Sequence, residues 1–97
     1  MSMHPLSPQI AEDFAISALG WIAGEPDQTQ AFVEHSGVAP DQISASATDP
    51  GFLVSVLDFI LLDDERVIAL GIALSRPPED VLRARAGLPG GDLPHWT

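Results

Sequence analysis

One stretch, GFLVSVLDFILLDDERVIALGIAL at residues 51–74, restricts most strongly what this chain can fold into. It is mostly apolar, but four consecutive charged residues at positions 63–66 interrupt it. The apolar run before them covers residues 52–62 and includes Asp58, and the run after them covers residues 67–74. A membrane-spanning helix needs about 20 consecutive apolar residues, so neither run is long enough to span a bilayer. The stretch therefore predicts two helices joined by a charged turn that caps the second helix.

The first of these two helices is expected at the centre of the protein. Its apolar residues cover most of the helix circumference, which is typical of a helix that is buried on nearly all sides. A second apolar pattern with helical spacing follows Pro8. No window shows the strict alternation of a half-buried strand, so an all-α fold is predicted. The predicted core consists of Phe14, Leu19, Ile22, Phe32, Phe52, Val56, Leu57, Phe59 and Ile60.

Capping residues, prolines and glycines divide the chain into short helices. Helix starts are indicated by a capping side chain or a proline at the first helical position, at Ser7-Pro8, Asp27 with Gln30, Pro40, Asp49-Pro50 and residues 63–65. Helix ends are indicated by residues that cannot continue a helix, at Gly24, Gly37, Pro77-Pro78 and Gly87. These signals predict a compact bundle of about six helices in a single domain over residues 1–97.

An internal similarity suggests how the helices are grouped. When the chain is shifted by 38 positions, residues 14–47 lie over residues 52–85, and Phe14, Ser17 and Leu19 meet Phe52, Ser55 and Leu57. The predicted helix breaks coincide as well. We interpret this as two similar three-helix units, residues 8–47 and 49–87, each too small to bury its own apolar face. Residues 88–97 form a Pro/Gly-rich tail that is predicted to be flexible.

Charge limits the classes of partner. The chain has 14 acidic residues, four arginines and no lysine, which gives a net charge of −10. Proteins bind nucleic acids and anionic lipids through basic residues, which are scarce here, so neither is expected as a partner. The acids are scattered rather than in one block, which favours solubility over a dedicated acidic face. The first residues lack the basic and apolar regions of a signal peptide, so a soluble, cytoplasmic protein is expected.

The sequence offers no recognisable catalytic or cofactor site. The chain has no cysteine. His4, His35 and His95 are not spaced as a local metal pair. There is no G-x-S-x-G motif and no glycine-rich phosphate loop after a strand. Asp58 is interpreted as an exposed or hydrogen-bonded acid because no second catalytic group accompanies it. We therefore expect no enzyme, no cofactor and no metal.

Three function classes remain at this point. The first is a protein-interaction or adaptor module with an unknown protein partner, a homodimer included. The second is a helix-turn-helix regulator, because residues 31–47 could form two helices around Gly37, although the second helix has no arginine or lysine. The third is a small-molecule-binding protein with a pocket between the two units. The absence of catalytic motifs and the negative charge favour the first class.

Four residues are candidates for contact with a partner. Arg76, Arg83 and Arg85 form the only basic region. They either pair with nearby acids such as Glu79 and Asp80, or anchor an acidic partner or the acidic half of a second copy. Trp96 either folds back or supplies an apolar anchor. A separate stripe of Asp13, Ser17, Gly20 and Gly24 is compatible with close helix packing and equally with a solvent-exposed face.

Three segments carry a resemblance to a known family: AEDFAISALGWIAGEP, TDPGFLVSVLDFILLDD and RPPEDVLRARAGLPGGD. They resemble a group of short bacterial proteins that are catalogued as a domain of unknown function. The resemblance covers nearly the whole chain and rests on helix and cap patterns. It implies a bacterial, all-helical protein, and it implies no activity, ligand or functional residue.

The charge balance generates a first prediction. We expect no appreciable binding to duplex DNA at physiological salt, because an excess of carboxylates opposes contact with phosphates. Fluorescence anisotropy with random and genomic duplexes at about 150 mM salt measures this, since phosphate contacts persist there. Sub-micromolar, sequence-selective binding that is lost in Gln42→Ala would contradict the prediction and favour the regulator.

Overall fold

The helix starts follow the capping residues of the sequence. The computed structural model describes residues 4–88, apart from the side chain of Ser44. Helix α1 (Pro8–Gly24) begins after Ser7, whose Oγ accepts a hydrogen bond from the Ile10 backbone N at 3.3 Å. Helices α4 (Pro50–Leu61) and α5 (Asp64–Leu74) begin after Asp49 and Asp63, whose carboxylates accept backbone N–H groups at 3.0 and 2.9 Å. These three starts are confirmed.

One predicted cap is wrong. Helix α2 (Pro26–Ser36) starts one residue before Asp27, and no side chain caps it. Its first turn is instead joined to α1 by Thr29, whose hydroxyl donates to the Ile22 carbonyl at 2.6 Å. Gly37 ends α2 in the left-handed conformation (φ 77°), as predicted.

The next elements also depart in detail from simple helices. A 3₁₀ turn η1 (Pro40–Gln42) precedes a single α-turn, α3 (Ile43–Ser46). Helix α5 ends because Ser75 adopts the left-handed conformation (φ 57°), one residue before Arg76 and ahead of the two prolines. Helix α6 (Glu79–Gly87) follows. The described residues contain helices and no strand, so the predicted all-α class is confirmed.

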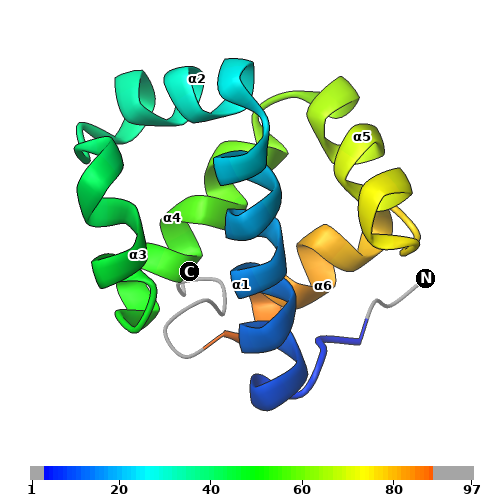
Figure 1. The fold of residues 1–97 in the computed structure, drawn as a ribbon. Coiled ribbons are helices and arrows are strands. Elements are labelled where there is room, and N and C mark those ends of the chain that lie inside the picture. The colour runs from blue at the N-terminus through cyan, green and yellow to red at the C-terminus, as the bar shows by residue number, and fades with distance from the viewer. Residues whose placement is uncertain (1–3, 89–97) are drawn as a thin grey trace, which may run out of the picture.

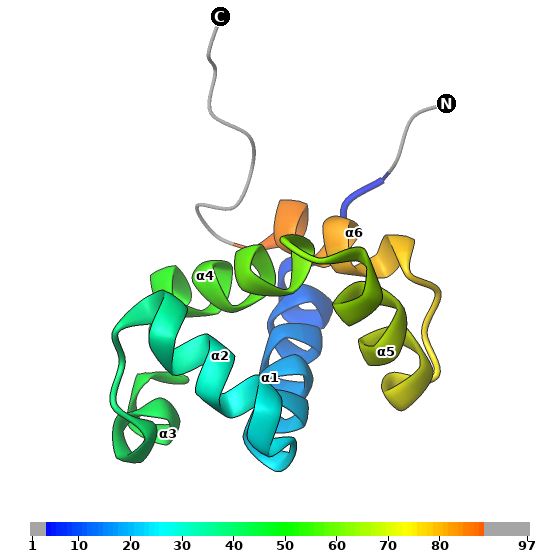
Figure 2. The same ribbon diagram turned by 90° about the horizontal axis from the view of Figure 1, so that it is seen from above.

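Helices α1 and α4 form the centre of the fold. They pack against each other, and α6 packs against both. Figures 1 and 2 show α2 and α5 on opposite sides of this centre, with α3 at the edge beyond α2. Helix α5 has contacts with α1, α4 and α6, yet it remains an outer helix with one face directed away from the bundle. Among residues 4–88, no helix combines the length and the hydropathy that a membrane span requires.

The core contains every residue that the apolar patterns placed there. All nine predicted side chains are buried: Phe14, Leu19, Ile22, Phe32, Phe52, Val56, Leu57, Phe59 and Ile60. Phe32 lies between two rings of α4 and meets each of them edge-on, Phe52 at 5.7 Å and Phe59 at 5.2 Å between centroids. The predicted central position of α4 is thereby confirmed.

The segment before α1 is also part of the packed structure. The Leu6 side chain is buried, and its backbone N donates to the Arg83 carbonyl of α6 at 3.0 Å. Gly87 allows this approach, because a Cβ at that position would overlap with the Leu6 carbonyl oxygen. The start of the described chain is therefore fixed against its last helix.

The stripe of small residues on α1 faces solvent. Asp13, Ser17, Gly20 and Gly24 are all exposed. A Cβ added to Gly20 or Gly24 would meet no atom within 4 Å. The stripe is therefore not a surface for close packing between helices of this chain.

The core generates a second prediction. Phe59→Ala should lower the free energy of unfolding by about 3–5 kcal/mol, as truncation of a buried aromatic ring leaves a cavity. Phe59 is 1% exposed, whereas Leu62, three residues further on, is 65% exposed. Leu62→Ala is the matched control and should cost less than about 0.5 kcal/mol. Denaturant titration of both variants measures the free energy of unfolding. A loss below about 1 kcal/mol for Phe59→Ala would show that the ring is not at the centre of the core.

Candidate interaction surface

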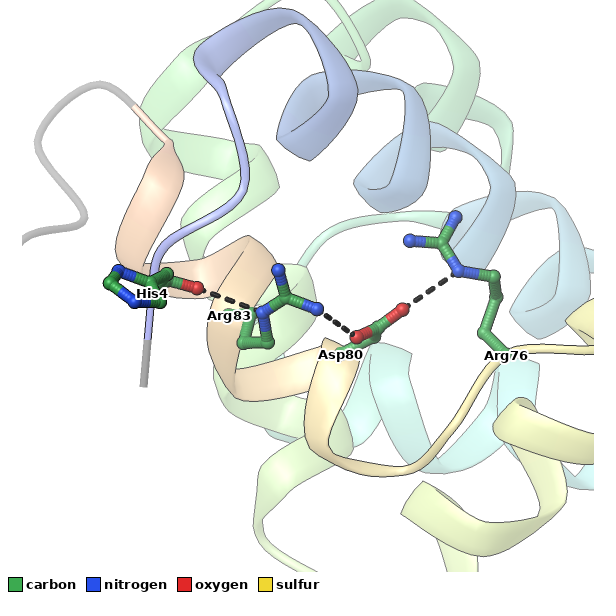
Figure 3. A network of polar contacts seen from close by, with 4 residues as sticks. All are labelled: His4, Arg76, Asp80 and Arg83. Carbon is green, nitrogen blue, oxygen red and sulfur yellow. Dashed lines mark hydrogen bonds and ion pairs between the residues drawn. The ribbon is translucent and has the colours of Figure 1, made fainter. Parts of the chain in front are cut away.

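A buried carboxylate binds two of the three candidate arginines. Asp80 is 3% exposed, and it lies in the first turn of α6. Its Oδ2 accepts from Arg76 Nε and its Oδ1 from Arg83 Nη1, each at 2.8 Å. Arg83 Nε also donates to the His4 carbonyl at 2.8 Å, so the network joins the N-terminal segment to α6 and to the end of α5 (Figure 3). Burial of a carboxylate is costly without such partners.

The third candidate arginine holds α6 to the central helix α4. Arg85 Nε donates to Asp58 Oδ1 at 2.7 Å, and Nη2 donates to Oδ2 at 3.3 Å. Asp58 is therefore a hydrogen-bonded acid, as predicted. Pairing with Asp80 is confirmed for Arg76 and Arg83. The three arginines do not form one basic cluster, because their charges are distributed over two separate ion-pair sites. Trp96 lies outside the described residues.

The fourth arginine, Arg66, which the sequence patterns did not single out, also stabilises the fold. Arg66 Nε donates to Gln28 Oε1 at 2.8 Å, and Nη1 donates to the Phe59 carbonyl at 3.1 Å. Its guanidinium lies 4.0 Å from the centroid of the Phe59 ring. Arg66 thus joins α2, α4 and α5. The signal in the sequence was the imbalance of charge. With four arginines against 14 acids, each arginine is expected to bind a specific acceptor in the fold.

The described histidines do not gather with other metal-ligating residues, and the second element of the helix-turn-helix candidate is short. His35 is exposed beside Phe59, with centroids 5.7 Å apart, and His95 lies outside the described residues. Among the described residues, no group of three or more His, Cys, Asp or Glu could hold a metal. In the 31–47 segment the second helix is one 3₁₀ turn followed by one α-turn, which gives a short element for insertion into a DNA groove.

The outward face of α5 is apolar. Ile68 is 51% exposed and Ile72 is 76% exposed, and Ala69 and Ala73 beside them are exposed as well. The opposite face of α5 buries Leu70 and Gly71. A helix with one face in the core and a second apolar face in solvent has more apolar surface than the fold itself uses.

One shallow hollow adjoins this face, a second lies between α1 and the end of α5, and both are lined by Arg76. One, of about 240 Å³, is lined by Ile68, Gly71, Ile72, Ser75, Arg76 and Pro78. The other, of about 280 Å³, is lined by Ile10, Asp13, Phe14, Ser17, Leu74 and Arg76. Arg76 is held in place by Asp80, and its guanidinium lies 5.4 Å from the Phe14 ring centroid. We refer to the exposed residues Glu65, Ile68, Ala69, Ile72 and Ala73 together with Arg76 as the α5 surface.

Sequence reasoning found one residue of this surface, Arg76, and missed the others. The sequence places residues 67–74 in one apolar helix, but periodicity reveals the apolar residues and not which of them a neighbouring helix covers. The repeat of isoleucine and alanine at positions 68–69 and 72–73 was the signal present in the sequence.

Comparison with known proteins identifies the family. A family model described as "Protein of unknown function (DUF3572)" matches residues 8–91. The chain belongs to this family. No curated protein and no solved structure gave a significant match. The expected membership in a family of unknown function is confirmed.

The Asp80 network generates a third prediction. Asp80→Ala should lower the free energy of unfolding by about 1.5–3 kcal/mol, because two charge-assisted hydrogen bonds are lost. Glu79→Ala is the control: Glu79 is exposed in the same helical turn, and its loss should cost less than about 1 kcal/mol. Thermal and denaturant unfolding measure both. Equal effects of the two variants would mean that the network contributes nothing beyond general helix electrostatics.

Proposed function

We propose that this member of the family is a non-enzymatic protein-interaction or adaptor module that binds its partner through the α5 surface. The observation that carries the proposal is the exposure of Ile68 and Ile72 on a helix whose other face is already in the core. Solvation of these side chains is unfavourable. Full burial of an exposed aliphatic side chain contributes about 1.5–3 kcal/mol, so a protein partner would gain most of that at Ile72, which is 76% exposed, and about half of it at Ile68, which is 51% exposed. Contiguous exposed apolar surface is typical of protein-interaction sites.

The shape of the surface favours a protein over a small molecule. The two hollows are shallow, and at about 240 and 280 Å³ they lie below the usual size of a ligand pocket. Both are open to solvent rather than enclosed, and the smaller one borders the apolar face of α5. Such a surface suits the side chains of a facing helix, each of which fills a hollow while the helix covers the apolar face.

The electrostatics favour a protein over DNA. Each of the four arginines has an acceptor within this chain, so phosphates would have to compete with carboxylate, amide or carbonyl oxygens. With a net charge of −10, the long-range field is repulsive to a nucleic acid.

We also propose that residues 8–47 and 49–87 are two copies of one ancestral helical unit. Arg66 contacts Gln28, and these residues are 38 positions apart, which is the offset of the sequence similarity. Contact between equivalent residues is expected near an axis that relates two similar halves. Helices α1 and α4 pack centrally, and each packs on the helix that follows it. The third helices differ, because α6 packs on α1 and α4 whereas α3 lies mainly against η1.

A fourth prediction tests the proposed function in the cells that produce the protein. A photo-crosslinking amino acid at Ala69, in the centre of the α5 surface, should give a covalent adduct with a protein of defined mass. The control is the same amino acid at Leu82, which is 43% exposed on α6 and lines neither hollow; it should give no such adduct. The readout is the adduct pattern on a gel, followed by mass spectrometry of the bands.

Two results would contradict the function. Equal adducts at both positions would show that the α5 surface has no special role. No protein adduct at Ala69, together with a bound small molecule of constant mass in native mass spectrometry, would replace the interaction module by a small-molecule carrier.

A further inference from the structure

We propose that the partner which covers the α5 surface is a basic amphipathic helix of another protein. The inference rests on the proposed function and names the chemistry of the partner for the same surface. Two observations carry it together. One edge of α5 is apolar and adjoins a hollow, and the exposed carboxylates around this edge have no counter-ion within residues 4–88.

The apolar edge consists of Ile68 and Ile72. They are four residues apart, so their side chains lie on one side of α5, one turn from each other. They are 51% and 76% exposed, and both line the hollow of about 240 Å³ between α5 and Pro78. The other edge of the exposed face carries the smaller side chains of Ala69 and Ala73. A partner therefore makes most apolar contact along the isoleucine edge.

The hollow beside this edge depends on a glycine. A Cβ at Gly71 would lie 2.8 Å from the Arg76 carbonyl oxygen, so a side chain there would push away the segment that follows α5. That segment turns back at the left-handed Ser75 and brings Pro78 close to the helix. A facing helix can cover the isoleucines and place one large apolar side chain in the hollow between them and Pro78.

Negative charge flanks the apolar edge. Asp64 and Glu65 lie four and three residues before Ile68, which places them on the same side of α5, one turn earlier. Glu79 directly follows Pro78, which lines the hollow. All three carboxylates belong to exposed residues, and none of them forms an ion pair within the described residues. The three acids therefore remain available to the basic side chains of a partner.

The arginines near α5 do not neutralise these acids. Arg76 lines the hollow, but its Nε donates to Oδ2 of the buried Asp80 at 2.8 Å, and its guanidinium lies 5.4 Å from the centroid of the Phe14 ring on α1. Arg66 donates to acceptors on α2 and α4 instead. The field around the apolar edge is therefore negative, and it attracts the lysines or arginines of a partner.

A second copy of the chain fits these observations less well. It would bring the same carboxylates to the same edge, and each copy has a net charge of −10. An uncharged apolar helix would cover the isoleucines but would leave the flanking acids without a partner. A basic amphipathic helix supplies apolar contact from one side of the helix and positive charge from the residues beside it.

The experiment measures binding of a synthetic peptide to the full chain by fluorescence anisotropy. The probe is a labelled peptide of about 18 residues made of leucine, alanine and lysine, which is long enough to form a helix and has its leucines on one side. We expect a dissociation constant on the order of 1 to 100 µM at about 20 mM NaCl. A scrambled peptide of the same composition should bind at least about tenfold more weakly, because its leucines share no common side.

A pair of matched variants tests the apolar edge. Ile72→Ser should weaken binding of the amphipathic peptide about tenfold, because it removes the most exposed apolar side chain of the edge. Ile16→Ser is the control. Ile16 is 44% exposed on α1 and lines neither hollow, so its loss should leave binding unchanged. Circular dichroism should show the same helix content for both variants and the wild type.

A second pair tests the charges. Asp64→Asn/Glu65→Gln should weaken binding about fivefold at about 20 mM NaCl, because two exposed ion pairs with the peptide are lost. Glu34→Gln/Asp41→Asn removes the same charge from α2 and η1, which lie on the other side of the fold, and should change binding less than about twofold. Raising NaCl to about 150 mM should weaken wild-type binding at least about threefold, since it screens these pairs.

The outcomes separate this inference from the proposed function. Equal binding of the amphipathic and scrambled peptides overturns the inference, and so does binding that Ile72→Ser leaves intact or no binding up to about 500 µM. Self-association in sedimentation velocity that Ile72→Ser abolishes would overturn it in favour of a second copy. In each case, a protein adduct at position 69 would still support the interaction module. Binding that needs both Ile72 and the two carboxylates supports the basic amphipathic helix.

Discussion

The ion pairs of the Asp80 carboxylate are the interaction that positions several segments of the fold. A buried, charged group is tolerated only when opposite charge and hydrogen bonds compensate for its lost hydration. Arg76 and Arg83 supply this compensation from two sides, at 2.8 Å each. Because Arg83 also binds the His4 carbonyl, one carboxylate sets the positions of the N-terminal segment, α6 and the chain that leaves α5. The position of Arg76 beside α5 is a consequence of this network.

The four arginines show how a strongly acidic chain uses few cations. Arg66 caps the end of α4 and covers Phe59, Arg85 holds α6 to α4, and the other two enclose Asp80. Arg66, Arg83 and Arg85 thereby join segments that are distant in the sequence, and Arg76 holds the chain that leaves α5 to the start of α6. The outer surface is left with an excess of carboxylates, which opposes nucleic acid but leaves apolar contact with another protein available. The exposed isoleucines of α5 are where that contact would gain most.

Much of the local structure could be read from the sequence, because capping is a short-range interaction. Ser7, Asp49 and Asp63 each bind a backbone N–H two or three residues further on, so residue type and spacing suffice to predict them. Asp27 was assigned as a cap in error, because Pro26 already provides a favourable first helical position. The left-handed Ser75 was not predicted, since few signals mark a non-glycine residue with that backbone conformation.

The sequence by itself determined the all-α class, the main helix starts and the nine core residues, because periodicity and capping depend on neighbours along the chain. Only the tertiary structure decided which apolar residues remain outside. Residues 67–74 are as apolar as a core segment, yet the bundle covers Leu70 and leaves Ile68 and Ile72 in solvent. Only the fold brought Gln28 to Arg66 and His4 to Arg83. The physical reason is that burial and long-range pairing depend on how helices pack, and packing is a property of the whole chain.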